Sequence, residues 1–339
     1  MSTNPYRHST TIIWMAATVL LTCAFSAAQM KIDKKAFWFP NRVPEPGNNK
    51  QSPQRVKLGK MLFFDPRLSG SNWISCATCH NPALGWSDGL PTAIGNGMGA
   101  LLRSTPSIVN TAFNDSQMWD GRFHTLEEQA AGPIEAPGEM NGHMDQILVK
   151  LKSIPGYVQE FDKAYPGEGI SKETVTKAIA SFERTIISRA SPFDEWTHGN
   201  QAAISLSAKR GFKLFAGKAK CVACHQAPNF TDDGFHNVGL KDTEDEGRYA
   251  QVPIKVSKGA FKTPTLRDVA LTAPYMHNGM YRTLEEVVEH YDRGGDNKEN
   301  LDPNIKPLQL TSQEKKDLVQ FMKTLSGKQV AIIVPRLPQ

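Results

Sequence analysis

Cysteine is scarce in this sequence, with five residues among 339. Long runs of alternating polar and apolar residues are also lacking, so a substantial β-sheet is not expected. Charge of neither sign dominates, because the formal net charge is only +5. This balance is too mild to indicate nucleic acid or an anionic membrane surface as a partner. Hydrophobic residues make up 40% and charged residues 22%, a composition that argues against a disordered or membrane-embedded chain.

Four of the five cysteines fall into two copies of one pattern, Cys-x-x-Cys-His. The residues are Cys76, Cys79 and His80 in the first copy and Cys221, Cys224 and His225 in the second. This is the attachment motif of haem c, in which both thiols form thioethers with the porphyrin and the histidine supplies an axial nitrogen to the iron. A disulfide, a thioredoxin-like redox pair or a structural zinc site would not need a histidine after each second cysteine. The motifs therefore predict two covalently bound haem c groups.

One apolar run stands apart near the N-terminus, from Ile12 to Phe25, after the basic Arg7. Small residues at 26–28 offer a cleavage site. The run is shorter than a bilayer span requires, so a secretory signal peptide over 1–28 fits better than a permanent anchor, although an uncleaved anchor stays open. Because haem c is attached outside the cytoplasm, the leader and the haem motifs both predict the periplasm.

The remaining chain reads as helices joined by long loops. Apolar residues at three- and four-residue spacings predict helices over 55–64, 144–151, 174–187, 206–215, 284–291 and 312–325. Thr311 and Glu314 form a capping box for the last of these helices. Connections rich in glycine and proline, at 81–105 and 228–262, are long enough to be functional or wrapped around a ligand.

The predicted fold class is mainly α, with two cytochrome c-like haem domains whose long loops wrap around the haems. A boundary near 190–201 gives an N-terminal haem c domain over 29–190, completed by 312–339. The C-terminal haem c domain then covers 191–311.

Several strings outside the haem motifs are more specific. They are Leu62–Gly70, Trp119–Arg122, Glu128–Ile134, Lys262–Arg267 and Ala273–Gly279. As an ordered set they resemble the bacterial dihaem cytochrome c peroxidase family, which includes MauG and its relatives. The resemblance covers residues 56–325, nearly all of the chain after the leader.

The resemblance assigns roles to matching positions. The first haem would be the peroxide-binding haem, and the second would be the electron-transfer haem. Trp119 matches the tryptophan between the haems, while Gln129 and Glu139 match the polar pair over the open face of the first iron, with Pro133 nearby. His277 is expected to be a structural hydrogen-bonding residue near the second haem.

The resemblance also implies a structural calcium ion. Its expected ligands include the backbone carbonyls of Thr272 and Pro274. The side-chain ligand in the family is usually an asparagine, but Ser104 stands at that place, and a hydroxyl is a weaker calcium ligand than an amide carbonyl.

Two departures from the peroxide-scavenging members point to the MauG subgroup. Asn96 stands where those members carry a histidine that ligates the resting first haem, so this haem is expected to rest with an open site. Tyr291 stands where they place a methionine as second axial ligand of the C-terminal haem. A phenolate there should lower the potential and stabilise higher oxidation states. His290 is the main competitor of Tyr291, and Met276 and Met280 are weaker ones.

The expected function is a periplasmic, MauG-like peroxidase that reduces hydrogen peroxide at the first haem, shares the oxidising equivalents with the His/Tyr-ligated second haem and oxidises a protein partner. Glu139 would act as general acid and base and Gln129 would orient the peroxide. One alternative is a peroxide-scavenging cytochrome c peroxidase fed by a small cytochrome or copper protein. Another is a non-enzymatic dihaem electron carrier. The expected partners are peroxide and an electron-donor protein, with no nucleic acid, and a homodimer stays open.

Overall fold

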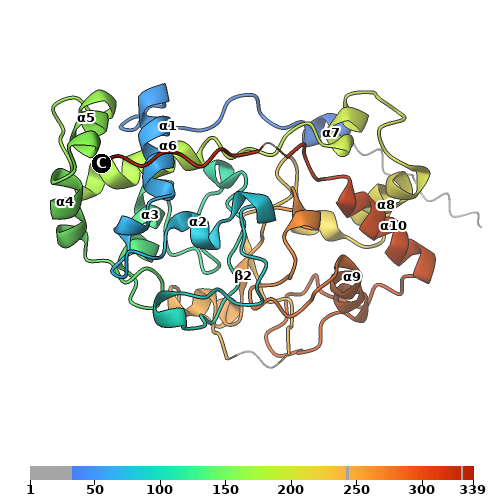
Figure 1. The fold of residues 1–339 in the computed structure, drawn as a ribbon. Helices are drawn as coiled ribbons and strands as arrows, with labels where there is room; N and C mark the ends of the chain where they lie inside the picture. The colour runs from blue at the N-terminus through green and yellow to red at the C-terminus, as the bar shows by residue number, and fades with distance from the viewer. Residues whose placement is uncertain (1–32, 242–243, 330) are drawn as a thin grey trace, which may run out of the picture. The chain divides into compact units, whose positions relative to one another are not determined.

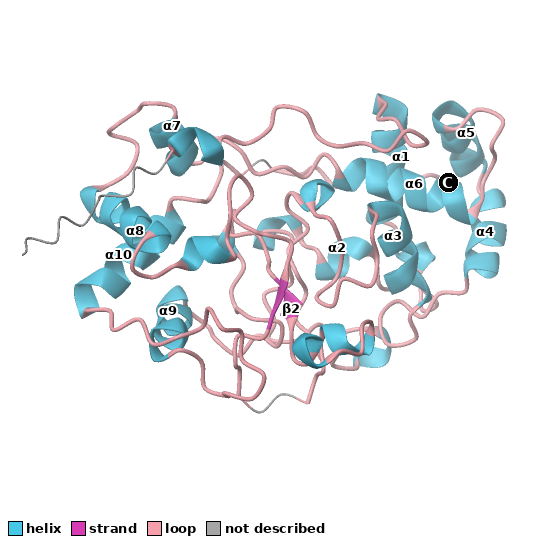
Figure 2. Cartoon of the chain, turned by 180° about the vertical axis from the view of Figure 1, so that it is seen from behind, coloured by secondary structure: helices cyan, strands magenta, loops and turns pink. Residues whose placement is uncertain are grey.

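Helices dominate the computed structural model, which describes residues 33–241, 244–329 and 331–339. The leader predicted over 1–28, with Cys23, lies outside the described residues. The helices are α1 Pro53–Phe63, α2 Cys76–Cys79, α3 Leu126–Glu135, α4 Met144–Lys152, α5 Pro155–Ala164, α6 Lys172–Glu183, α7 Pro192–Thr197, α8 Leu206–Ala216, α9 Leu284–Arg293 and α10 Ser312–Lys323. The described strands, β1 Phe235–His236 and β2 Phe261–Lys262, pair antiparallel (Figure 2). The mainly α expectation is confirmed.

The six helices predicted from the sequence are present as α1, α4, α6, α8, α9 and α10. The one predicted over 174–187 begins earlier and stops at Glu183. The capping box of α10 is also present, with Thr311 Oγ1 accepting from Glu314 N at 3.2 Å. Four of the described helices were not predicted, namely α2, α3, α5 and α7. In α3 the pair Gly132 and Pro133 interrupts the helical signal, yet the capping box between Thr125 and Glu128 starts the helix.

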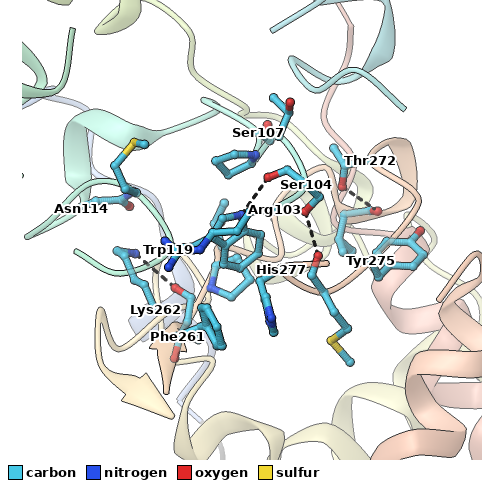
Figure 3. A pocket seen from close by; sticks show the side chains of 18 of the residues that line it. Arg103, Ser104, Ser107, Asn114, Trp119, Phe261, Lys262, Thr272, Tyr275 and His277 are labelled. Carbon is cyan, nitrogen blue, oxygen red and sulfur yellow. Dashed lines mark hydrogen bonds between the residues drawn. The ribbon is translucent and has the colours of Figure 1, made fainter. Parts of the chain in front are cut away.

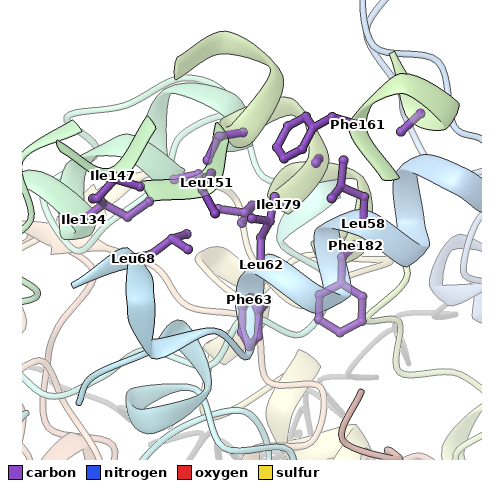
Figure 4. Close-up of a cluster of buried hydrophobic side chains, with 14 of the residues drawn as sticks. Leu58, Leu62, Phe63, Leu68, Ile134, Ile147, Leu151, Phe161, Ile179 and Phe182 are labelled. Atoms are coloured by element: carbon purple, nitrogen blue, oxygen red, sulfur yellow. The ribbon is translucent and has the colours of Figure 1, made fainter. Parts of the chain in front are cut away.

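The first hydrophobic core lies between α1 and α6 and is closed by α3, α4 and α5 (Figure 4). Leu58, Leu62 and Phe63 of α1 are fully buried against it. Gly59 lets the two helix backbones touch, because a Cβ there would collide with the Ala178 carbonyl of α6.

The second core is also built on a pair of closely packed helices, α8 and α10. It lies at the opposite end of the described residues in Figure 1. Gly211 of α8 faces the backbone of Asp317 in α10 so closely that a Cβ would collide with its carbonyl. Aromatic rings fill this core, with Phe193 5.3 Å from Phe212 and Phe215 5.0 Å from Phe321, centroid to centroid. Each core thus supports one haem motif.

The two ends of the described chain cross between the cores, as the blue and dark red segments of Figure 1 show. Phe37, in the N-terminal segment, packs in the second core, 5.3 Å from Phe212. The C-terminal tail leaves the second core after α10 and reaches the first, where the Gly156 N–H donates to the Gln339 carbonyl at 3.1 Å. The segment 312–339, expected to complete the first domain, is divided by this packing. Its helix α10 belongs to the second core, and only the tail reaches the first.

Long irregular loops fill the space between the two cores. They include residues 81–105 and the described parts of 228–262, the same stretches that composition marks as loops. Within the described residues, no helix is long and apolar enough to cross a membrane.

Candidate dihaem site

A cavity of about 690 Å³ extends between the two cores. Its wall contains both Cys-x-x-Cys-His motifs, and the long loops supply much of the rest. Apolar atoms dominate the lining, as a porphyrin requires. The structure therefore brings together two motifs that are 145 positions apart in the sequence, counted from Cys76 to Cys221.

The first motif forms the short helix α2 and the turn that ends it. The His80 N–H donates to the Cys76 carbonyl at 2.8 Å, which turns the imidazole toward the cavity. The Nδ1 atom of His80 lies 3.2 Å from the Trp86 carbonyl, so Nδ1 carries the proton and Nε2 is left to bind iron. Burial lowers the pKa of His80 and keeps the imidazole neutral, the form that ligates metals.

The second motif repeats this arrangement on a single 3₁₀ turn, Cys221–Ala223. His225 Nδ1 lies 2.9 Å from the Phe230 carbonyl, and burial again lowers the pKa of the imidazole. Burial also raises the pKa of Cys79 to about 11 and that of Cys221 to about 12, so both free thiols keep their protons. An apolar cavity with two oriented imidazoles and four thiols fits two haem c groups.

Residues expected over the first iron line the same cavity. Gln129 and Pro133 come from α3, and Glu139 comes from the loop after it. Burial raises the pKa of Glu139, and the guanidinium of Arg122, 3.9 Å away, opposes that rise. The Glu139 carboxyl thus lies in the cavity wall with one cationic neighbour.

Trp119 stands in the wall of the cavity that both motifs line (Figure 3). Its indole Nε1–H donates to the Ser104 carbonyl at 2.9 Å, which fixes the orientation of the ring. The His277 ring meets Trp119 edge-on at 6.4 Å and stacks on Phe261 at 3.5 Å. The three rings form a contiguous aromatic group in the cavity wall.

The expected calcium ligands lie near one another but are not tested by this structure. Ser104, Thr272 and Pro274 all line the cavity. The Ser104 hydroxyl donates to the Met276 carbonyl at 2.9 Å, so its hydrogen already has a partner while its lone pairs remain available. Calcium stays a prediction.

The environments of Tyr291 and His290 differ. Both nitrogens of His290 have protein partners: Nδ1 lies 3.0 Å from the Tyr281 hydroxyl, and Nε2 lies 2.9 Å from the Val238 carbonyl. Tyr291 instead lines the cavity beside Cys221. Burial raises the pKa of its phenol. Helix α9 therefore turns the tyrosine, and not the histidine, toward the cavity, and ligation of the second iron by Tyr291 stays a prediction.

Two buried side chains of the cavity wall each have a polar atom without a hydrogen-bond partner in the described chain. The Nε2 atom of His277 has no hydrogen-bond partner among the described residues, and burial lowers the pKa of this imidazole to about 4. Its expected hydrogen-bonding role beside the second haem stays a prediction. Glu183, at the end of α6, has a buried Oε2 without a partner in the described chain, and its pKa is raised by burial to about 8. A glutamate at a helix end reads as a surface residue, so no sequence signal would have found it.

The loop that carries Asn96 leans on the segment that carries Glu139. The Asn96 N–H donates to the Gly138 carbonyl at 3.1 Å. Gly95 is needed for this approach, because a Cβ there would collide with the same carbonyl. A backbone contact thus ties this loop to the segment that carries Glu139.

Comparison with known proteins matches both halves to families. Residues 53–202 match the model of the di-haem cytochrome c peroxidases, and residues 208–326 match that of cytochrome c. The chain is 48% identical over 308 residues to the methylamine utilization protein MauG of Methylorubrum extorquens, covering 90% of this chain and 87% of that one. It is 36% identical over 309 residues to the cytochrome c551 peroxidase of Pseudomonas aeruginosa, covering 88% and 86%.

This chain belongs to the dihaem cytochrome c peroxidase and MauG family. A crystal structure of a MauG-like protein associated with microbial copper homeostasis superposes with a TM-score of 0.80 at 31% identity, covering 86% of this chain and 95% of the other. The expected pair of cytochrome c-like domains is confirmed. The protein is a dihaem oxidoreductase with two haem cofactors, and as a family member it uses peroxide and an electron-donor protein.

Proposed function

We propose that this enzyme is a periplasmic, MauG-like peroxidase that oxidises an aromatic side chain on a partner protein. The observation that carries the proposal is the placement of Tyr291 in the cavity while both nitrogens of His290 are engaged elsewhere. A phenolate ligand stabilises higher oxidation states of iron, which suits an enzyme that must wait for a slow or distant donor. Two similar proteins carry the name MauG, at 48% and 41% identity.

The residues of the cavity divide the work of peroxide reduction. Bound haem supplies the site at which peroxide accepts electrons and a store for the oxidising equivalents. Gln129 orients the peroxide, while Glu139 takes a proton from one peroxide oxygen and returns it to the departing oxygen. Hydrogen peroxide, two electrons and two protons thereby give two molecules of water. Trp119, held by Ser104, lies on the path by which the partner's two electrons reach the haem positions.

The proposal also covers the cellular location, the attachment of the haems and a calcium ion. The apolar leader and the haem c motifs support secretion to the periplasm and covalent haem attachment through Cys76, Cys79, Cys221 and Cys224. Ser104, Thr272 and Pro274 would hold a calcium ion beside Trp119.

The second candidate is a peroxidase that merely removes peroxide, as the name of the 36% identical cytochrome c551 peroxidase suggests for that relative. Decay of the peroxide-oxidised enzyme, followed with and without reduced cytochrome c, separates the two functions. We expect a long-lived oxidised enzyme and sluggish turnover with the cytochrome. In the Trp119→Phe variant the shared oxidised state should be lost. A kcat/KM near ~10⁶ M⁻¹s⁻¹ or above for the cytochrome would instead establish the scavenging peroxidase.

The resting ferric enzyme is expected to contain one high-spin and one low-spin haem without prior reduction. The reason is Asn96, which cannot ligate the first iron as a histidine would, and whose loop is held at Gly138. Electron paramagnetic resonance at neutral pH checks this. Asn96→His should convert the first haem to the low-spin form and slow the reaction with peroxide. A spectrum of the unaltered enzyme with low-spin signals alone would contradict the open site and revive the electron-carrier reading.

A further inference from the structure

A chain of alternating charges runs from Glu139 into the second half of the molecule. Arg122 Nη2 lies 3.9 Å from Glu139 Oε1, and Arg122 Nη1 donates to Asp120 Oδ2 at 2.9 Å. The same oxygen of Asp120 accepts a second bond, from Arg103 Nη1, at 2.8 Å. Arg103 then forms a two-pronged pair with Asp245, through Nε at 2.6 Å and Nη2 at 2.9 Å.

The low exposure of these charged side chains determines how strongly they interact. The Asp120 side chain is 2% exposed and that of Arg103 is 21% exposed, so their contacts are poorly screened by water. Asp120 also accepts the backbone N–H of Arg122 at 3.3 Å, which ties both ends of that residue to one carboxylate. A long, flexible arginine is thereby held in one orientation, with one guanidinium nitrogen left to face Glu139.

We propose that Arg122 is a positioning residue for Glu139, held in place by Asp120, Arg103 and Asp245. The inference rests on the proposed role of Glu139 in proton transfer. A guanidinium close to the carboxyl favours the ionised form and so offsets the effect of burial. The other titratable group near Glu139 is Cys79, which loses its titration once it forms the thioether. Arg122 therefore keeps Glu139 able to accept a proton from peroxide at neutral pH.

The test compares variants of the haem-loaded enzyme. In Arg122→Gln we expect the pKa of Glu139 to rise by about one unit, because a single charge about 4 Å away acts on a partly exposed carboxyl. The acidic limb of the pH profile for the peroxide reaction should move to higher pH by the same amount. Arg122→Lys keeps the charge and should restore most of the shift. Asp120→Asn should give a smaller shift in the same direction, because Arg122 loses its anchor.

Arg248→Gln is the matched control. Arg248 Nη1 donates to the carbonyls of Asp120 and Gly121 at 2.8 Å each, so it braces the same loop without facing Glu139. It should leave the acidic limb in place. Haem content, measured for every variant, shows whether the fold has survived.

Infrared titration of the carboxylic acid C=O band, assigned by its loss in Glu139→Gln, gives a readout that is independent of turnover. If the pH midpoint of this titration did not move in Arg122→Gln, or moved equally in Arg248→Gln, the assignment of Arg122 would be overturned. If the midpoint moved while the pH profile of the rate did not, the coupling would be confirmed and Glu139 would not be the proton carrier.

Discussion

Replacing Glu139 by glutamine is expected to slow the reaction with peroxide by ~10²–10⁴-fold while both haems remain attached. Glutamine keeps the size of the side chain but cannot shuttle a proton between the two peroxide oxygens. Burial already shifts the pKa of the Glu139 carboxyl upward, toward the working pH at which general acid–base exchange is most effective. Stopped-flow absorbance of the haems after addition of peroxide measures the rate.

Glu135→Gln is the matched control for this prediction. Glu135 belongs to the same helix-and-loop segment but pairs with Lys172 on the surface, at 2.6 Å. It should react at the unaltered rate. A loss of less than tenfold in Glu139→Gln would mean that another group carries the proton. Neither Glu127 nor Glu128 is well placed to do so, because Glu127 pairs with Arg184 and Glu128 caps the start of α3.

Replacing Tyr291 by phenylalanine is expected to remove the low-spin signal of the second haem altogether. Without the phenolate, α9 would supply no ligand to the second haem. Tyr291→His should restore a low-spin haem but destabilise the oxidised enzyme, because neutral imidazole donates less charge than phenolate. Electron paramagnetic resonance of the ferric protein and the lifetime of the peroxide-oxidised state are the two measurements.

Tyr275→Phe serves as the matched control, since Tyr275 is another half-buried tyrosine of the cavity wall, its pKa raised by burial to about 12. It should leave the low-spin signal intact. His290→Gln is informative in the other direction. If this variant lost the signal while Tyr291→Phe kept it, the histidine would be the ligand and the MauG-like proposal would fail.

The sequence predicted those features that depend on neighbours along the chain. The haem motifs are local patterns, and helices such as α8 and α10 follow from apolar spacing and caps. The ligand on α9 could not be chosen in this way. Tyr291 and His290 are adjacent, and only the contacts of His290 with Tyr281 and Val238, from distant segments, show which side chain faces the cavity.

Residues whose role depends on distant charges were missed for the same reason. The contact of Arg103 with Asp245 joins positions 142 apart, so no periodicity encodes it. Glu183 looks like an ordinary polar helix end until the surrounding cavity is seen. From the sequence, the whole segment 312–339 was expected to complete the N-terminal domain. Its residue pattern carries no sign that the chain leaves the second core after α10.

The crossing of the two chain ends has a consequence for how the halves can move. Domains joined by a modest interface are expected to swing relative to each other. Here a hinge motion would have to pull Phe37 out of an aromatic core at one end and the Gln339 contact with Gly156 from the other. Each half is thus fastened to the core of the other half, so a change in the spacing of the two haem motifs would have to break these contacts. If the chain were cut near residue 190, each fragment would lose the contact that the other supplies, and neither should fold as a faithful half of the enzyme.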